Sequence, residues 1–171
     1  FMLENLSKPV VFTGSQLPIG DLRTDAKENL ITAIQIASLQ HKGKPVINEV
    51  CLYFEYKLHR GNRTTKINAE HFNAFTSPNY SPLAESGVHL KVNHHLIIPR
   101  NSSKKLMVHK ELDDNVVVLK MFPGINETVL NAILNIPNLK GMILETYGSG
   151  NAPTEDWFLS VLKKASKKGL H

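Results

Sequence analysis

The sequence predicts an α/β protein with a parallel sheet flanked by helices. Short runs of β-branched and aromatic residues alternate with longer segments whose apolar residues recur every three or four positions. A strand–helix–strand order with crossovers of this length is typical of right-handed βαβ units. The predicted strands cover 8–14, 49–58, 115–122 and 141–146, and the predicted helices start at 24 or 25, at 126 and at 154.

The first predicted unit begins with the apolar run 8–14, which suits a strand buried on both faces. A loop follows, and then leucine, isoleucine and alanine residues take up helical spacing. Thr24 or Asp25 is the expected cap of this helix, and Gly43 marks its end. The run 49–58 supplies the next strand, which completes a βαβ unit.

The second predicted unit follows a β-rich segment, 88–99, and a polar stretch, 100–105, that has the composition of a linker. It consists of two strands, each followed by a helix. In order, these are strand 115–122, helix 126–136, strand 141–146, a glycine-containing loop at 147–153, and helix 154–165 with Thr154 as its cap.

The composition excludes several classes of protein. The net charge of +5 comes from scattered lysines without a basic stripe, so we expect no nucleic-acid partner. No apolar run approaches the roughly 18 residues of a membrane span, so we expect a soluble protein. The single cysteine, Cys51, fits a reducing compartment, and residues 1–6 look like the end of a helix rather than a secretion signal. We therefore expect a cytoplasmic protein.

The segment 58–67 contains the residues best suited to chemistry. It follows a predicted buried strand, so we expect it to leave the sheet at the edge where α/β proteins bind ligands. Two threonines precede Lys66, whose amine could assist a hydroxyl nucleophile if burial or a neighbouring charge lowered its pKa. The alternative is a solvated lysine in a surface hairpin.

Other polar clusters have simpler interpretations. Asp25 and Asn29 are explained by the start of a helix. The loop 148–151 lacks the third glycine and the Gly-Lys ending of a phosphate loop. His94 and His95, as neighbours on a strand, would point to opposite faces, so we expect no metal site and no cofactor.

Five strings occur in the order and spacing of the bacterial asparaginases, and the chain resembles their cytoplasmic type I branch along its whole length. The strings are VFTGSQLP (11–18), RTDAKENL (23–30), RGNRTTK (60–66), FTSPNY (75–80) and YGSGNAP (147–153).

This resemblance implies the second half of a flavodoxin-like N-terminal domain (1–90), a linker (91–113) and the start of a smaller Rossmann-like C-terminal domain (114–171). It implies hydrolysis of asparagine to aspartate and ammonia through an acyl-enzyme on a threonine. The native protein would then be a homodimer or a homotetramer.

The resemblance also implies roles for individual residues. Lys66 matches the catalytic lysine of the family. Ser15 matches a position where a main-chain carbonyl faces the substrate amide, although a simple turn explains it equally well. Asn151 lies in a loop that reaches a neighbouring subunit's site, and Thr65 lies where a regulatory asparagine site could form. Glu145 stands near the place of an arginine that would bind the ligand carboxylate, which puts that role in doubt.

Two family motifs are absent from the sequence. Neither the Thr-Gly-Gly-Thr-Ile type loop with the nucleophile nor the Asp-Gly-Thr-Asp-Thr type motif occurs. We therefore expect an internal fragment that is inactive alone. The alternatives are the asparaginase-like subunit of a tRNA-dependent amidotransferase and a non-catalytic module with the same fold.

Overall fold

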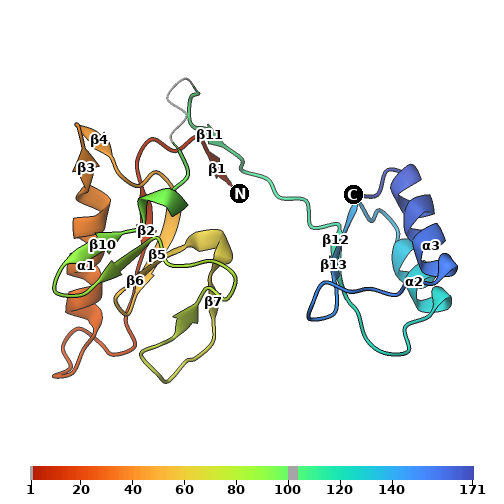
Figure 1. Ribbon diagram of the computed structural model, residues 1–171, viewed down its shortest axis with the longest axis horizontal. Helices are drawn as coiled ribbons and strands as arrows, with labels where there is room; N and C mark the ends of the chain where they lie inside the picture. The colour runs from red at the N-terminus through yellow and green to blue at the C-terminus, as the bar shows by residue number, and fades with distance from the viewer. Residues whose placement is uncertain (1, 100–103) are drawn as a thin grey trace. The chain divides into compact units, whose positions relative to one another are not determined.

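A computed structural model describes residues 2–99 and 104–171 of the chain. The chain divides into two compact units, Phe1–Lys110 and Glu111–His171, and each is described by itself (Figure 1). Residues 100–103 of the predicted linker stretch, and Phe1 of the predicted helix end, lie outside the described residues.

The N-terminal unit contains a five-stranded sheet with the strand order β10-β9-β6-β5-β2. Strands β2 and β5 run parallel and are connected through helix α1, as the βαβ prediction requires. The other neighbours pair antiparallel, so the predicted α/β class is confirmed but this sheet is mixed rather than parallel throughout. The elements are β2 (Val10–Phe12), α1 (Ala26–Ser38), β5 (Val50–Phe54), β6 (Lys57–Arg60), β9 (Ala84–Ser86) and β10 (Leu90–Val92).

The segment 49–58, predicted as one strand, is a hairpin. Strands β5 and β6 pair antiparallel, and the turn between them consists of Glu55 (φ 45°) and Tyr56 (φ 64°). Two left-handed residues are typical of a type I′ turn. The prediction was wrong because such turns normally carry Asn-Gly or Asp-Gly, and a Glu-Tyr pair gives no such signal.

The opening residues are extended, so the predicted helix end was wrong within the described residues. Strand β1 (Leu3–Glu4) pairs antiparallel with β11 (Met107–Val108). Asn5 follows with a left-handed backbone (φ 58°), a conformation that interrupts a helix.

Two further short hairpins belong to this unit. Strands β3 (Gln40–His41) and β4 (Lys44–Pro45) form the first, and it contains the glycine expected to end the helix. Strands β7 (Thr65–Lys66) and β8 (Phe75–Thr76) form the second. Two 3₁₀ turns, η1 (Gly61–Arg63) and η2 (His94–Leu96), precede β7 and follow β10.

Helix α1 covers one face of the sheet. Its buried residues Ala33 and Ile36 pack in one cluster with Cys51, Tyr53 and Leu58 of the β5–β6 hairpin. Side chains alternate between the two faces of a strand, so Val50 and Phe54 belong to the opposite face. The β7–β8 hairpin lies on that opposite face, as the ring contact of Phe54 with β8 shows (Figure 1).

The C-terminal unit has the predicted order of strand, helix, strand and helix. Strands β12 (Val116–Lys120) and β13 (Gly141–Glu145) are parallel neighbours. Helices α2 (Glu127–Leu134) and α3 (Asp156–Lys167) contribute Leu130 and Phe158 to the core of this unit. The side chain of Asn126 caps α2 by accepting the Val129 N–H at 3.0 Å. Residue Thr154, the predicted cap of α3, lies before Glu155, which occupies the N-cap position.

Candidate active site

The loop after β2 is held in place by the carboxylate of Asp25. This carboxylate accepts the backbone N–H of Gln16 at 3.0 Å and that of Leu17 at 3.1 Å. Asp25 occupies the N-cap position of α1, yet its side chain makes no cap hydrogen bond. The hydroxyl of Thr24 instead accepts the Ala26 N–H at 3.0 Å. Of the two predicted caps, Thr24 therefore serves the helix and Asp25 serves the loop.

Asn29 connects the same loop to the β5–β6 turn. Its side-chain amide donates to the carbonyl oxygen of Gly14 (2.9 Å) and to the carboxylate of Asp25 (3.1 Å), and its oxygen accepts the Glu55 N–H (3.2 Å). The side chain is buried, with 1% of the residue exposed. The sequence explained Asn29 by the start of a helix, whereas its side chain links three separate segments. Ser15 directly follows Gly14 in this loop and is exposed.

The segment that carries Lys66 leaves the sheet at the end opposite to Gly14. Gly14 follows β2, which runs parallel to β5, whereas β6 runs back and ends where Arg60 pairs with Cys51, near the start of β5. The expected departure of 58–67 at the ligand-binding edge was therefore wrong, because residues 57–60 are the returning strand of a hairpin.

The segment then returns along the face of the sheet. A Cβ atom on Gly61 would lie 3.0 Å from the backbone oxygen of Val50, so the chain lies directly on the first residue of β5. Lys66 pairs with Phe75 across the β7–β8 hairpin. The ring of Phe75 makes an edge contact with that of Phe54, the last residue of β5, at 5.1 Å between centroids. Residues 61–66 thus span the length of β5.

This path brings Lys66 to the end of the sheet where Gly14 lies. The Nζ atom of Lys66 lies 5.9 Å from the centroid of Phe75, an arrangement that suits a cation–π contact. The next ring, Phe54, reaches within 3.9 Å of the position that a Cβ atom on Gly14 would occupy. A continuous row of contacts therefore connects the exposed amine of Lys66 to the loop after β2.

A direct hydrogen bond joins the hairpin to that loop. The side-chain amide of Gln16 donates to the carbonyl oxygen of His71, in the β7–β8 connection, at 2.6 Å. Ser15 and Lys66 therefore belong to two segments that touch. We name the loop 14–17 and the hairpin β7–β8 together the candidate site. It presents one amine, several hydroxyls and backbone carbonyls to solvent, a set suited to proton transfer at a polar substrate.

Thr65 precedes Lys66 on β7 and pairs with Thr76. Adjacent residues of a strand point to opposite sides, so Thr65 and Lys66 do not share one side of the hairpin. Both residues are exposed.

Asn151 belongs to the C-terminal unit. Its carbonyl oxygen accepts the Tyr147 N–H at 2.9 Å, and its side-chain amide donates to the Ser149 hydroxyl at 3.1 Å, so it closes its own loop. The side chain is exposed. Glu145, at the end of β13, forms an exposed ion pair with Lys120 at 2.9 Å.

Three titratable groups lie buried in the sheet of the N-terminal unit. Burial, together with the neighbouring carboxylate of Glu28, raises the pKa of Tyr53 to about 12, and the Tyr53 hydroxyl donates to Glu28 at 2.6 Å. Burial raises the pKa of the Cys51 thiol to about 12, so this thiol is inert, as its sequence context indicated. Burial and the charge of Lys57 lower the pKa of His59.

His59 is a residue that the sequence did not single out. It is 6% exposed, and its Nδ1 atom has no hydrogen-bond partner among the described residues. Its position on β6, where Leu58 faces α1, places it on the face that the Lys66 hairpin covers. Only the alternation of β6 could have indicated this, and the predicted strand ended before His59.

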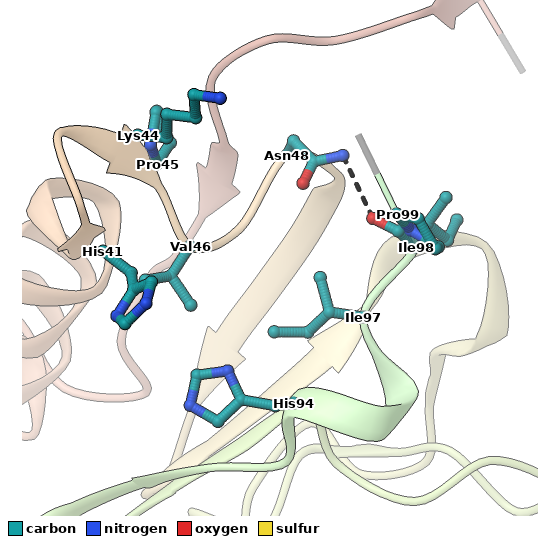
Figure 2. A pocket seen from close by; sticks show the side chains of 9 residues that line it. All are labelled: His41, Lys44, Pro45, Val46, Asn48, His94, Ile97, Ile98 and Pro99. Carbon is teal, nitrogen blue, oxygen red and sulfur yellow. Dashed lines mark hydrogen bonds between the residues drawn. The ribbon is translucent and has the colours of Figure 1, made fainter. Parts of the chain in front are cut away.

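A pocket of the N-terminal unit lies along other elements (Figure 2). His94 belongs to the 3₁₀ turn η2, so the expectation that His94 and His95 lie on a strand was wrong. The pocket is separate from the candidate site, because neither Ser15 nor Lys66 lines it. Its lining residues are His41, Lys44, Pro45, Val46, Asn48, His94, Ile97, Ile98 and Pro99.

Within residues 2–99 and 104–171, no three His, Cys, Asp or Glu side chains lie together as a metal-binding group. No helix in these ranges is long and apolar enough to cross a membrane.

The two units define a protein of the α/β class with a lysine-bearing hairpin at the end of its larger sheet. Residues 1–98 match the family model "Asparaginase, N-terminal", and residues 115–171 match "Glutaminase/Asparaginase C-terminal domain". The chain therefore belongs to the asparaginase family.

Curated relatives agree with this family over nearly the whole chain. The chain is 43% identical to L-asparaginase 1 of Escherichia coli (strain K12) over 99% of its own length and 48% of the relative's. It is 45% identical to a protein of Mus musculus named 60 kDa lysophospholipase, over 99% of the chain and 29% of that relative. One subunit of the glutamyl-tRNA(Gln) amidotransferase of Methanococcus vannielii is 29% identical, over 99% of the chain and 40% of that relative.

Solved structures share the fold. L-asparaginase I from Vibrio cholerae superposes with a TM-score of 0.82 at 39% identity, and the match covers 99% of this chain and 49% of that one. The thermostable L-asparaginase from Thermococcus kodakarensis gives a TM-score of 0.72 at 34% identity, over 97% and 48%. The chain thus spans about half the length of the asparaginases it matches.

Proposed function

We propose that the protein containing this chain is an L-asparaginase, which hydrolyses L-asparagine to L-aspartate and ammonia. The observation that carries the proposal is the contact between the Lys66 hairpin and the loop that contains Ser15. Membership of the asparaginase family and the identity to L-asparaginase 1 support the choice of substrate.

In the proposed reaction a threonine hydroxyl attacks the side-chain carbonyl carbon of asparagine. The C–N bond breaks, the nitrogen leaves as ammonia after taking up a proton, and water then hydrolyses the acyl-enzyme to aspartate. Lys66 assists the transfer of the hydroxyl proton. Its amine is suited to this task because it is accessible to solvent and its neighbour on β8 is an aromatic ring rather than a competing acid.

The nucleophile is assigned to a part of the protein outside these 171 residues. Neither threonine motif of the family occurs in the sequence, and the chain spans about half of its asparaginase relatives. We therefore propose that residues 1–171 alone release no ammonia, because the covalent route needs the threonine.

The remaining residues receive supporting roles in the proposal. Ser15 contributes a backbone carbonyl that faces the substrate amide, since an amide donor needs an acceptor. Asn151 would act at the site of a neighbouring subunit in a homodimer or homotetramer, and Thr65 at a regulatory asparagine site. A cytoplasmic location fits the single cysteine, which is buried.

Two other functions follow from the names of relatives. The amidotransferase subunit is the weaker candidate, because its identity of 29% lies well below the 43% of the asparaginase. A lysophospholipase, at 45% identity, would use the same acyl transfer on an ester instead of an amide. Both are separate outcomes of the experiment.

The test uses the complete gene product, with Lys66→Ala and the control Lys91→Ala. Both lysines are exposed and lie on short strands of the same unit, and Lys91 lies outside the candidate site. We expect ammonia release from asparagine, a loss of about 100- to 10,000-fold in Lys66→Ala, and no change in Lys91→Ala.

Glutamine and lysophosphatidylcholine are assayed in parallel. Release of fatty acid without release of ammonia would favour the lysophospholipase. The asparaginase proposal fails if the complete protein contains both threonine motifs and leaves asparagine intact. The role of Lys66 fails if Lys66→Ala keeps its activity within about threefold.

A further inference from the structure

A buried ion pair lies at the base of the segment that leads to Lys66. Arg60 is the last residue of β6, and its Nε atom donates to the carboxylate of Glu49 at 2.5 Å, with a second bond from Nη2 at 3.1 Å. The side chains are only 13% and 4% exposed. This geometry is bidentate, so it fixes the plane of the guanidinium as well as its position.

The same pair holds a distant part of the chain. Arg60 Nη2 donates to the carbonyl oxygen of Leu96 at 2.7 Å, and Glu49 accepts the Ile98 N–H at 2.7 Å. The neighbouring Asn48 side chain donates to the Ile98 oxygen at 3.2 Å (Figure 2). The ion pair therefore has its remaining hydrogen-bonding groups satisfied by the segment 96–98, as a buried pair requires.

The outgoing stem of the Lys66 hairpin rests on the same guanidinium. The ring of Tyr80, four residues after β8, lies 4.4 Å from Arg60 Cζ and 5.8 Å from Arg63 Cζ. Its hydroxyl donates to the Leu96 oxygen at 3.1 Å, and Ser77 closes the turn before it with a 2.7 Å bond to the Tyr80 oxygen.

The incoming stem begins at the backbone of Arg60. Its carbonyl oxygen accepts the Thr64 hydroxyl at 2.7 Å, which closes the turn immediately before β7. Both stems of the β7–β8 hairpin therefore meet at one residue. Because each strand has only two residues, and a two-stranded hairpin is marginally stable by itself, the stems must determine where the hairpin lies.

We infer that Arg60, fixed by Glu49 and covered by Tyr80, is a positioning residue that places the amine of Lys66 at the candidate site. The kinetic consequence rests on the proposed function, whereas the structural consequence does not. A displacement of about 1 Å in a catalytic group can lower the rate about 100-fold. Loss of the clamp should therefore lower kcat without removing any group that contacts substrate.

The experiment compares Arg60→Lys, Glu49→Gln and Tyr80→Leu in the complete protein. Arg60→Lys keeps the charge but loses the bidentate geometry. Tyr80→Leu removes the covering ring and leaves no buried charge unpaired, so it tests the clamp if the other two fail to fold. The control is Lys140→Met, which removes the exposed ion pair with Asp113 in the C-terminal unit.

We expect kcat for asparagine to fall about 10- to 100-fold in the clamp variants, while KM changes less than about threefold. Hydrogen exchange should become faster at the amides of 61–66 and 75–80, and stay unchanged at Val10–Phe12. The control should match the unchanged protein in both measurements.

The two proposals can fail separately. If the unchanged protein releases no ammonia but the exchange pattern appears, the asparaginase proposal fails and the clamp stands. If the protein is active and Tyr80→Leu changes neither kcat nor the exchange at 61–66, the inference is overturned. Faster exchange at Val10–Phe12 to the same extent would also overturn it, because the effect would then be general.

Discussion

The side-chain amide of Asn29, on helix α1, donates a 2.9 Å hydrogen bond to the backbone oxygen of Gly14, after strand β2. The bond joins the helix to the loop that forms one half of the candidate site. With its bonds to Asp25 and to the N–H of Glu55, the same amide holds three segments in one arrangement. The folding of the unit and the shape of the site therefore depend on a shared residue.

Asn29→Ala should destabilise the N-terminal unit by about 3 kcal/mol. The substitution leaves buried backbone groups of Gly14 and Glu55 without partners, and each such group costs about 1–3 kcal/mol. Urea unfolding measures the effect. The control Asn151→Ala, at an exposed loop position, should stay within about 0.5 kcal/mol. A change of less than 1 kcal/mol in Asn29→Ala would show that the three bonds add little.

Gly61→Ala should destabilise the protein by about 1–3 kcal/mol and disturb the approach to Lys66. The added methyl group would meet the backbone oxygen of Val50 at 3.0 Å, and a strand backbone cannot move aside as a flexible side chain can. Gly20→Ala is the matched control, because nothing lies within 4 Å of its new methyl group. Thermal unfolding distinguishes them, and equal melting temperatures would contradict the close approach at Gly61.

Tyr56→Gly should stabilise the protein. Tyr56 adopts φ 64° in the β5–β6 turn, and this left-handed conformation costs a non-glycine residue about 1–2 kcal/mol. Glycine removes that cost but loses about 0.5–1 kcal/mol more conformational entropy on folding, so the expected gain is about 0.5–1 kcal/mol. Lys57→Gly, one residue later in β6, should destabilise instead. Equal losses in both variants would contradict the assignment of the turn.

The stability of the N-terminal unit should fall as the solution becomes acidic, because of His59. Burial lowers its folded-state pKa below the ordinary value of 6.5, so the unfolded chain binds the proton more readily. The contribution of His59 is complete above pH 6.5 and is lost as the pH falls from there toward the folded-state pKa. The slope is at most about 1.4 kcal/mol per pH unit for one proton.

Urea unfolding at several pH values between 5 and 8 checks this dependence. His59→Gln should remove the slope, whereas His89→Gln, at an exposed position, should retain it. If the slope persists in His59→Gln, another group causes the loss of stability.

The sequence by itself determined the α/β class, because β-branched runs and helical spacing are local patterns that the backbone reads directly. The C-terminal order of β12, α2, β13 and α3 followed from these patterns within a few residues at each end. The choice of Lys66 also came from the sequence, through the string RGNRTTK, and its catalytic role remains a proposal.

Only the tertiary structure decided how the N-terminal residues are used. The Glu55–Tyr56 turn carries no turn signal, so the reversal into β6 depends on antiparallel pairing and on Asn29, 26 positions away from Glu55. That reversal sends the chain to the far end of β5 and brings Lys66 back over the opposite face. The physical reason is that helix and strand patterns extend over neighbouring residues, whereas a site forms from residues that meet only after the chain has packed.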